Sequence, residues 1–257
     1  MISFTDSEIG ALVGSFLWPL FRIMGFFLAA PVLGANFIPM RVRLVMAVAV
    51  SLMISPSLTD IPAIPALSVQ ALVVVVQQVL IGVALGFFLQ MVFQLFILLG
   101  QMIAMQMGLG FASMVDPTNG INVAIVSTFY LMFATMLFVL LDGHLVMIEV
   151  IAESFEQIPI SDQSLSPDVY MRLVGTISWV FSSALLLALP ALTALLITNF
   201  AFGIMTRAAP QMNIFALGFP VALMFGLFII WLTMANFQTI ATSIFADMFA
   251  RMRSLLG

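Results

Sequence analysis

The chain is a succession of long apolar runs joined by short polar connections. The apolar regions cover residues 9–30, 44–55, 67–107, 123–151, 174–204 and 214–249. These runs are continuous, whereas the strands of membrane β-barrels alternate apolar and polar residues. No connection is long enough to hold a soluble domain. The pattern therefore predicts an all-α membrane protein that forms one membrane domain, residues 1–257.

Two of these regions are too long for simple membrane spans. Residues 67–107 would be roughly 60 Å long as a single helix, and a bilayer core is only about 30 Å thick. Residues 214–249 are nearly as long, with Pro220 near their start. We expect each of them to bend, to form a hairpin or to extend beyond the lipid.

The composition supports membrane placement and excludes several kinds of chemistry. Apolar residues make up 63% of the chain and charged residues 7%, against about 25% charged in soluble proteins. There is no Cys and only one His, so we expect no disulfide, no metal site and no cofactor. The net charge of −4 comes with no basic tract, so we expect no nucleic-acid partner.

The positions of the charges give a conflicting membrane topology. Arg41 and Arg43 are expected on the cytoplasmic side, which places the acidic N-terminus and the acidic loop 153–168 outside. Six full crossings would then leave the C-terminus outside, although it carries Arg251 and Arg253. The conflict disappears if one region is a re-entrant hairpin. It also disappears if the protein reaches its final position by a route other than ordinary membrane insertion.

A stripe of glutamine and glycine runs along residues 67–107. Its members are Gln78, Gly82, Gly86, Gln90 and Gln94, followed by Gln101. Because the first five recur at every fourth residue, they lie on one helix face. Glycine lets another backbone approach closely, and lipid cannot satisfy a glutamine amide. The stripe is therefore either packed within the monomer or, as we favour, in contact with another subunit or a channel.

The stripe leads into the apolar loop GLGFASMVDPTNG, residues 108–120. Glycine and Asp-Pro should break the helix there, and an apolar loop at membrane depth needs protein or a cavity around it. Either it is an ordinary buried turn, or it is a deformable plug that seals a channel and yields to a larger passenger. The candidate plug residues are Gly108, Leu109, Gly110, Phe111, Met114, Val115, Asp116 and Pro117.

Arg22 lies inside the first apolar region. An arginine at membrane depth is costly and usually pairs with another group or faces water. The candidate partners are Asp142, Glu149, Asp247 or an acid of another chain. We expect a structural ion pair, with a direct role in transport as the alternative.

The only Asp/His pairing is Asp142–Gly143–His144. The two side chains are two residues apart and cannot share a helix face, and no serine or oxyanion hole accompanies them. The chain also has no GxxxxGK[ST] nucleotide-binding loop. We expect either a packing role or a helix break here, and no enzymatic activity.

Five stretches, spread over most of the chain, carry a resemblance to a known family. They are RIMGFFLAAP at residues 22–31 with Gly34, PMRVR at 39–43, MGLGFASMVDPTNG at 107–120, LDGH at 141–144 and TRAAPQMNIFALGFP at 206–220. In these stretches and their order, the chain resembles the FliR/SctT family of type III secretion export-gate subunits. The flagellar branch is nearer than the injectisome branch.

This resemblance implies a fold, partners and a place in the cell. Members of the family assemble with FliP and FliQ into a helical export gate, on which FlhB docks above an FlhA ring. They consist of long bent helical hairpins, with a FliP-like part (about 1–175 here) and a FliQ-like part (about 176–257). The expected location is the bacterial inner membrane, in the flagellar basal body. Much of the gate lies above the membrane plane, which would explain the topology conflict.

The resemblance also implies a function. The family's loop at residues 108–120 plugs the closed channel near a ring of FliP methionines, and this role carries over to Leu109, Phe111, Met114 and Val115. We expect a non-enzymatic structural and gating subunit that contacts lipid and passes unfolded flagellar export substrates. The alternative is a secondary transporter for a small solute, which would need a midplane site with paired acids or an internal repeat.

Overall fold

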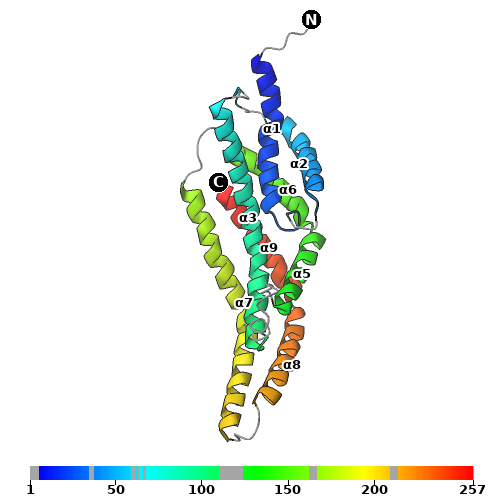
Figure 1. Cartoon of the computed structure of the whole chain (residues 1–257), viewed down its shortest axis with the longest axis vertical. Helices are drawn as coiled ribbons and strands as arrows, with labels where there is room; N and C mark the ends of the chain where they lie inside the picture. The colour runs from blue at the N-terminus through cyan, green and yellow to red at the C-terminus, as the bar shows by residue number, and fades with distance from the viewer. Residues whose placement is uncertain are drawn as a thin grey trace. The chain divides into compact units, whose positions relative to one another are not determined.

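The structure is a computed structural model that describes residues 6–34, 38–58, 62, 64–65, 68–109, 124–161, 167–208 and 214–256. These residues form α-helices and one short 3-10 helix, and none of them forms a strand (Figure 1). The elements are α1 (Asp6–Ala29), α2 (Met40–Ile54), η1 (Ser55–Ser57), α3 (Val69–Gln106), α5 (Ile125–Leu140), α6 (Gly143–Gln157), α7 (Pro167–Ala208), α8 (Ile214–Met234) and α9 (Phe237–Leu256). The all-α prediction is confirmed.

The helices pack into two compact units, each assembled from separate stretches of sequence. Unit 1 comprises Met1–Met91, Leu141–Thr176 and Ala246–Gly257, and unit 2 comprises Val92–Leu140 and Ile177–Phe245. Both units therefore contain residues from before and after position 175. The division into a FliP-like and a FliQ-like part stays a prediction.

The oversized region 67–107 forms one uninterrupted helix and no hairpin. Helix α3 has 38 residues, or about 57 Å at 1.5 Å per residue, which is longer than a bilayer core of about 30 Å. Its extension beyond the lipid stays a prediction. Helix α7 is longer still, with 42 residues and Pro190 in its interior. Proline removes one backbone donor, and here the helix continues through it.

Two other apolar regions are broken into helix pairs. The break between α5 and α6 falls at Asp142, which has a left-handed backbone with φ 55°. This confirms the helix break predicted there. The region 214–249 breaks at residues 235–236 between α8 and α9, whereas Pro220 lies inside α8.

By length and hydropathy, three segments of the described residues could each cross a membrane: Met40–Ser57, Val69–Gln106 and Met171–Ala208. The bent pairs α5 with α6 and α8 with α9 raise this number to five. Residues Gly14–Ala29 of α1 form a shorter apolar helix. The described residues thus contain up to five candidate membrane spans. The topology predicted from the charges assumed six crossings.

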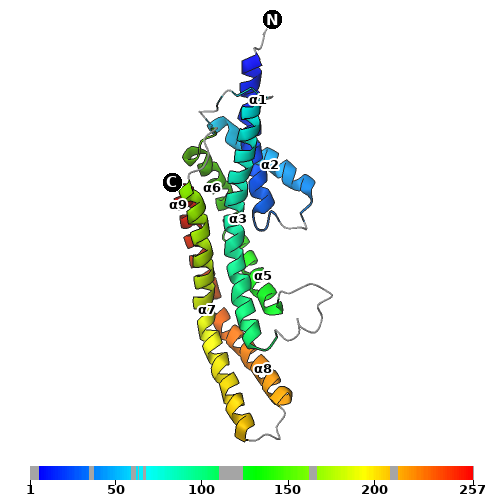
Figure 2. The same ribbon diagram turned by 60° about the vertical axis from the view of Figure 1, so that its left-hand side comes forward.

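In unit 1, α1 lies beside both α2 and α3 (Figures 1 and 2). Helix α2 runs antiparallel to α1 (Figure 1), and one serine of α2 and the first serine of η1 donate to carbonyl oxygens of α1. Ser51 Oγ donates to Phe16 O at 3.2 Å, and Ser55 Oγ donates to Ser15 O at 2.9 Å. These bonds satisfy hydroxyls that lipid could not, so they fix how α2 lies on α1.

Unit 2 has an aromatic core between α3, α5 and α9. Its members are Phe93, Phe96, Tyr130, Phe138, Phe237 and Phe245. Phe93 and Phe138 meet edge to face with ring centroids 5.2 Å apart, and Phe138 and Phe245 do so at 5.3 Å. Aromatic pairs prefer this geometry, so the cluster holds the three helices at defined positions.

Candidate functional site

The Gln/Gly stripe of α3 begins against α1 of the same chain. A Cβ atom on Gly82 would collide with the carbonyl oxygen of Arg22, and one on Gly86 would lie 2.6 Å from Phe26 O. Glycine at these positions lets two helix backbones touch, as small residues do at membrane helix contacts. The same holds on α1, where a Cβ atom added to Gly25 would lie 2.6 Å from Val79 O of α3.

The remaining glutamines of the stripe have different surroundings. Gln78 is fully buried beside α1, Gln90 is half-buried and Gln94 is exposed. Gln101 is half-buried and bonds to residues of its own chain. Contact with another subunit stays a prediction, and Gln94 is the stripe member whose side chain is most open to it.

Replacing Gln94 with leucine is expected to lower the yield of any complex in which this face contacts another subunit. The amide would no longer form hydrogen bonds across the contact, which in membranes contribute about 0.6–2 kcal/mol each. Native gels of detergent extracts measure the yield. The matched control is Gln70→Leu, because Gln70 is an exposed glutamine near the start of the same helix. Equal yields for both variants would place the Gln94 amide outside any subunit contact.

Arg22 is fully buried in unit 1 and is held by neutral groups. Its Nε donates to Gln78 Oε1 at 2.7 Å and its Nη2 to Ile158 O at 2.8 Å. Its Nη1 donates to Ser154 O at 2.7 Å and to Ser154 Oγ at 3.2 Å. The guanidinium carbon lies 4.1 Å from the centre of the Phe155 ring. We call these five residues the Arg22 joint.

The Arg22 joint ties α1 and α3 to the C-terminal end of α6. Helix α6 ends at Gln157, so Ser154 O and Ile158 O are carbonyls of its last turn and cap. Ser154 O also accepts the backbone N–H of Ile158 at 3.0 Å, and both carbonyls lie at the negative end of the helix dipole. The planar guanidinium fork supplies donors to several of them at once.

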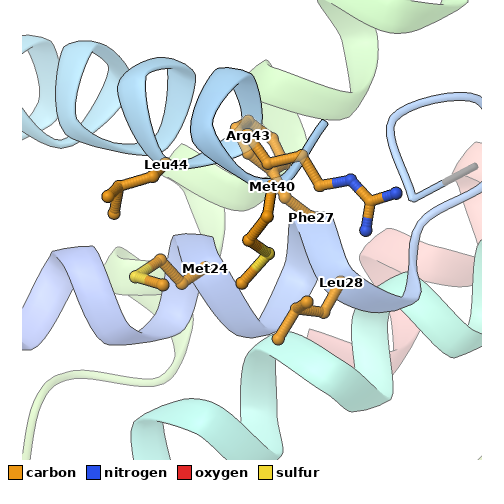
Figure 3. A pocket seen from close by; sticks show the side chains of 6 residues that line it. All are labelled: Met24, Phe27, Leu28, Met40, Arg43 and Leu44. Atoms are coloured by element: carbon orange, nitrogen blue, oxygen red, sulfur yellow. The ribbon is translucent and has the colours of Figure 1, made fainter. Parts of the chain in front are cut away.

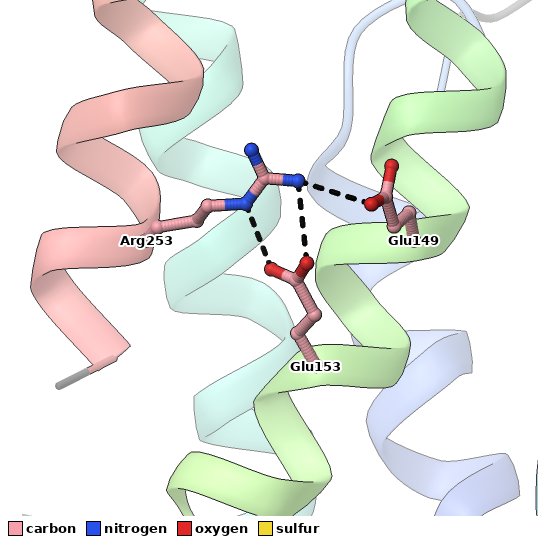
Figure 4. A network of polar contacts seen from close by, with 3 residues as sticks. All are labelled: Glu149, Glu153 and Arg253. Atoms are coloured by element: carbon pink, nitrogen blue, oxygen red, sulfur yellow. Dashed lines mark hydrogen bonds and ion pairs between the residues drawn. The ribbon is translucent and has the colours of Figure 1, made fainter.

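The joint corrects the expectation that an acid of this chain pairs with Arg22, and an acid of another chain stays a prediction. None of the three proposed acids, Asp142, Glu149 and Asp247, is among the groups described above that hold it. Glu149 lies with Glu153 beside Arg253 of α9 instead, at 3.2 Å and 2.9 Å from the guanidinium nitrogens (Figure 4). That network is exposed to a large degree, and exposed ion pairs contribute little stability.

Two features of the part of the chain that the structure describes bear on binding of a metal or a small ligand: its acidic and histidine side chains, and one hollow between two helices. In the described residues no three of the His, Asp and Glu side chains gather as metal ligands would. A hollow between α1 and α2 is lined by Met24, Phe27, Leu28, Met40, Arg43 and Leu44 (Figure 3). Its volume of about 10 Å³ holds about one water molecule. It is too small to be the binding site of a transported solute.

The end of α3, which leads into the predicted plug loop, packs on α8 in unit 2. Met107 is fully buried, and a Cβ atom on Gly226 of α8 would collide with its side chain. Gly108 follows with φ 84°, a backbone that glycine adopts at low cost. A Cβ there would lie 3.1 Å from the Phe219 ring. The side chain of Met107 thus packs directly against the backbone of α8 at Gly226.

Hydrogen bonds hold the residues on both sides of the segment 110–123. Asn199 of α7 donates from Nδ2 to Gln106 O, the last carbonyl of α3, at 3.0 Å. At the other side, Gln101 Oε1 accepts from the backbone N–H of Ala124 at 3.2 Å and from Ser127 Oγ at 3.4 Å. An N–H at a helix start has no partner within its helix, and Gln101 supplies one.

Of the predicted plug residues, Gly108 and Leu109 are described, and both are half-buried. The others lie outside the described residues: Gly110, Phe111, Met114, Val115, Asp116 and Pro117. The plug therefore stays a prediction. Asn199 and Gly226 could not be predicted as contact residues, because a single asparagine or glycine in an apolar helix forms no pattern.

The sequence matches a family model described as bacterial export proteins, family 1, over residues 13–248. It is 35% identical to the flagellar biosynthetic protein FliR of Pectobacterium carotovorum over 256 residues, which is 100% of this chain and 98% of that protein. It is 34% identical to the FliR protein of Escherichia coli K12, over 100% of this chain and 98% of that protein. The surface presentation of antigens protein SpaR of Salmonella typhimurium is 32% identical over 83% of this chain and 80% of its own length.

Proposed function

We propose that this chain, which belongs to family 1 of the bacterial export proteins, is a structural and gating subunit of the flagellar type III protein-export channel. It forms part of the pore wall with FliP and FliQ, contacts FlhB and FlhA, and supplies a plug loop. Its place is the inner membrane at the flagellar basal body. The main support for this proposal is the similarity to flagellar FliR proteins over the full length of the chain.

The exposed side of α7 supports a role as a wall between subunits. Large apolar side chains are exposed along it from Met171 to Met205, a length of about 51 Å on a helix. A bilayer core covers about 30 Å, and the usual tilt of up to about 40° does not make up the difference. Neighbouring gate subunits would cover the part of this apolar face that extends beyond the bilayer core.

Copurification separates this proposal from a secondary transporter. A gate subunit should be recovered from membranes in a stable complex with FliP- and FliQ-like chains. A transporter should instead move a small solute when it is the only protein in liposomes. Recovery of the chain alone, active in that assay, would contradict the proposal.

Replacing Phe111 and Met114 with glycine is expected to make the channel leak ions while the complex still assembles. The two side chains supply most of the apolar bulk that would fill the closed pore. Ion leak is measured as loss of membrane potential in cells that produce the complex, and assembly by native gel. The matched control replaces Thr118 and Asn119 with glycine, which removes polar side chains from the same loop. A tight double variant with normal assembly would mean that the loop is not the seal.

A further inference from the structure

Charged side chains distinguish the two compact units. In unit 1, several of them are exposed on α6 and on the end of α9, namely Glu149, Glu156, Asp247, Arg251 and Arg253. In unit 2, the described residues include one charged side chain, Arg207 near the end of α7. A charge inside a bilayer core is costly and ordinarily pairs with another group or faces water. A lipid-covered surface therefore fits unit 2, and it does not fit α6 or the end of α9.

The apolar surface of unit 2 includes α8 and the part of α7 from Leu185 to Met205, which run antiparallel (Figures 1 and 2). Their exposed side chains are mostly Leu, Ile, Phe and Met. Helix contacts inside membranes favour small residues, which let two backbones approach, and unit 2 uses Gly226 in this way against Met107. The large exposed side chains suit lipid chains better than a close helix contact. We call the exposed residues of 185–205 and 219–232 the α7–α8 face.

The hydroxyl groups on this part of α7 are satisfied by α7 itself. Thr193, Thr198 and Thr206 each donate from Oγ1 to a carbonyl oxygen of the same helix, at 2.8, 2.9 and 2.9 Å. Asn199 donates from Nδ2 to Gln106 O of α3. A hydroxyl that bonds within its own helix needs no outside partner, so it can face lipid without leaving a donor unpaired.

The length of α8 matches the thickness of a bilayer. The helix has 21 residues, or about 31 Å, and a bilayer core is about 30 Å thick. Arg207 lies near the end of α7, shortly before α8 begins, and Trp231 lies near the other end of α8 with 68% of its surface exposed. Tryptophan is enriched where the lipid core meets water, and arginine at the cytoplasmic side. Both residues therefore stand where the two edges of a lipid layer would fall.

We propose that the α7–α8 face is the main lipid-contacting surface of this chain, with Arg207 at the headgroups of the cytoplasmic leaflet and Trp231 at the opposite edge of the lipid core. The occupant is phospholipid, whose acyl chains cover the large apolar side chains. Helix α6 and the end of α9 lie outside the lipid. This assignment does not depend on the function proposed above, because a solute transporter with the same fold would meet lipid at the same face.

Single cysteines carrying a nitroxide spin label test the assignment, since the chain has no cysteine of its own. The full chain, with the chains that copurify with it, is placed in phospholipid nanodiscs. Power saturation then compares collisions with oxygen, which dissolves in lipid, and with a nickel chelate, which stays in water. Leu196→Cys on α7 is matched by Leu145→Cys on α6, because these leucines are 60% and 55% exposed. We expect an oxygen-to-nickel ratio several-fold higher at 196 than at 145.

Two results would overturn the assignment. A label at 196 that is shielded from oxygen and nickel alike would mean that protein covers the α7–α8 face. Equal ratios at 196 and 145 would mean that the distribution of charge does not determine which helices meet lipid.

The edges of the lipid layer are tested by three further cysteines, at exposed positions that leave Arg207 and Trp231 in place. Met224 lies about 15 Å along α8 from Ile214, so Met224→Cys should give the highest oxygen-to-nickel ratio. The ratio should fall at Leu232→Cys and at Ala208→Cys, near the two edges. A ratio that is equal at the three positions, or highest at 232 or 208, would contradict the placement of Arg207 and Trp231.

Discussion

Replacing Gly82 with alanine is expected to separate α1 from α3 and to destabilise unit 1 by about 3 kcal/mol, the upper end of the usual cost of overpacking. The added methyl group would meet the backbone of Arg22 and Phe26 and not the flexible end of a side chain. Backbone atoms cannot turn aside, so the helices themselves must move apart. Thermal unfolding of the purified protein in detergent, followed by loss of helical circular dichroism, measures the effect.

The chain contains a matched control for this prediction. Gly175, on α7 and also in unit 1, has nothing within 4 Å of an added Cβ. Alanine there should leave stability unchanged or raise it by up to about 1 kcal/mol, because alanine favours helix more than glycine does. If the two variants unfold at the same temperature, the close approach of α1 and α3 contributes no stability.

Replacing Arg22 with leucine is expected to cost about 2–6 kcal/mol, because an oxygen left buried without a donor costs about 1–3 kcal/mol and two are left so. These are Gln78 Oε1 and Ile158 O, whereas Ser154 O keeps the backbone N–H of Ile158. Lysine should rescue only part of the loss, because an ammonium group cannot reproduce the planar fork. The same unfolding measurement and the amount of chain recovered from membranes report the effect.

The control for Arg22 is another arginine bound to oxygens in unit 1. Arg253 bonds Glu149 and Glu153, and its side chain is 46% exposed. Arg253→Leu should change stability by no more than about 1 kcal/mol, since exposed ion pairs are weak. Equal losses for Arg22→Leu and Arg253→Leu would contradict the role given to the Arg22 joint.

The sequence predicted the features that depend on local pattern. Continuous apolar runs gave the all-α class, and Asp142–Gly143 gave the break before α6. The four-residue interval between Gln78, Gly82 and Gly86 predicted that they share one face of α3, the face that lies against α1. Residue spacing shows which side chains share a face of α3, but it does not show which helix packs against that face. The contact with α1 could therefore not be predicted.

The sequence also predicted that Arg22 needs partners but gave the wrong kind. A search for partners in a sequence looks for acidic side chains, because they are the residues that stand out. Two of the four oxygens that hold Arg22 are main-chain carbonyls at the end of α6, and every helix ends in such carbonyls. Which helix end folds against Arg22 is decided by tertiary packing.

The neutral character of the Arg22 joint also affects how unit 1 responds to acidity. Its acceptors are an amide, a hydroxyl and two main-chain carbonyls. None of these gains or loses a proton between about pH 5 and 8, where histidine is the side chain that ordinarily titrates. A carboxylate partner could have been neutralised at an acidic membrane surface. The joint therefore holds α1, α3 and α6 in the same way on either side of a proton gradient.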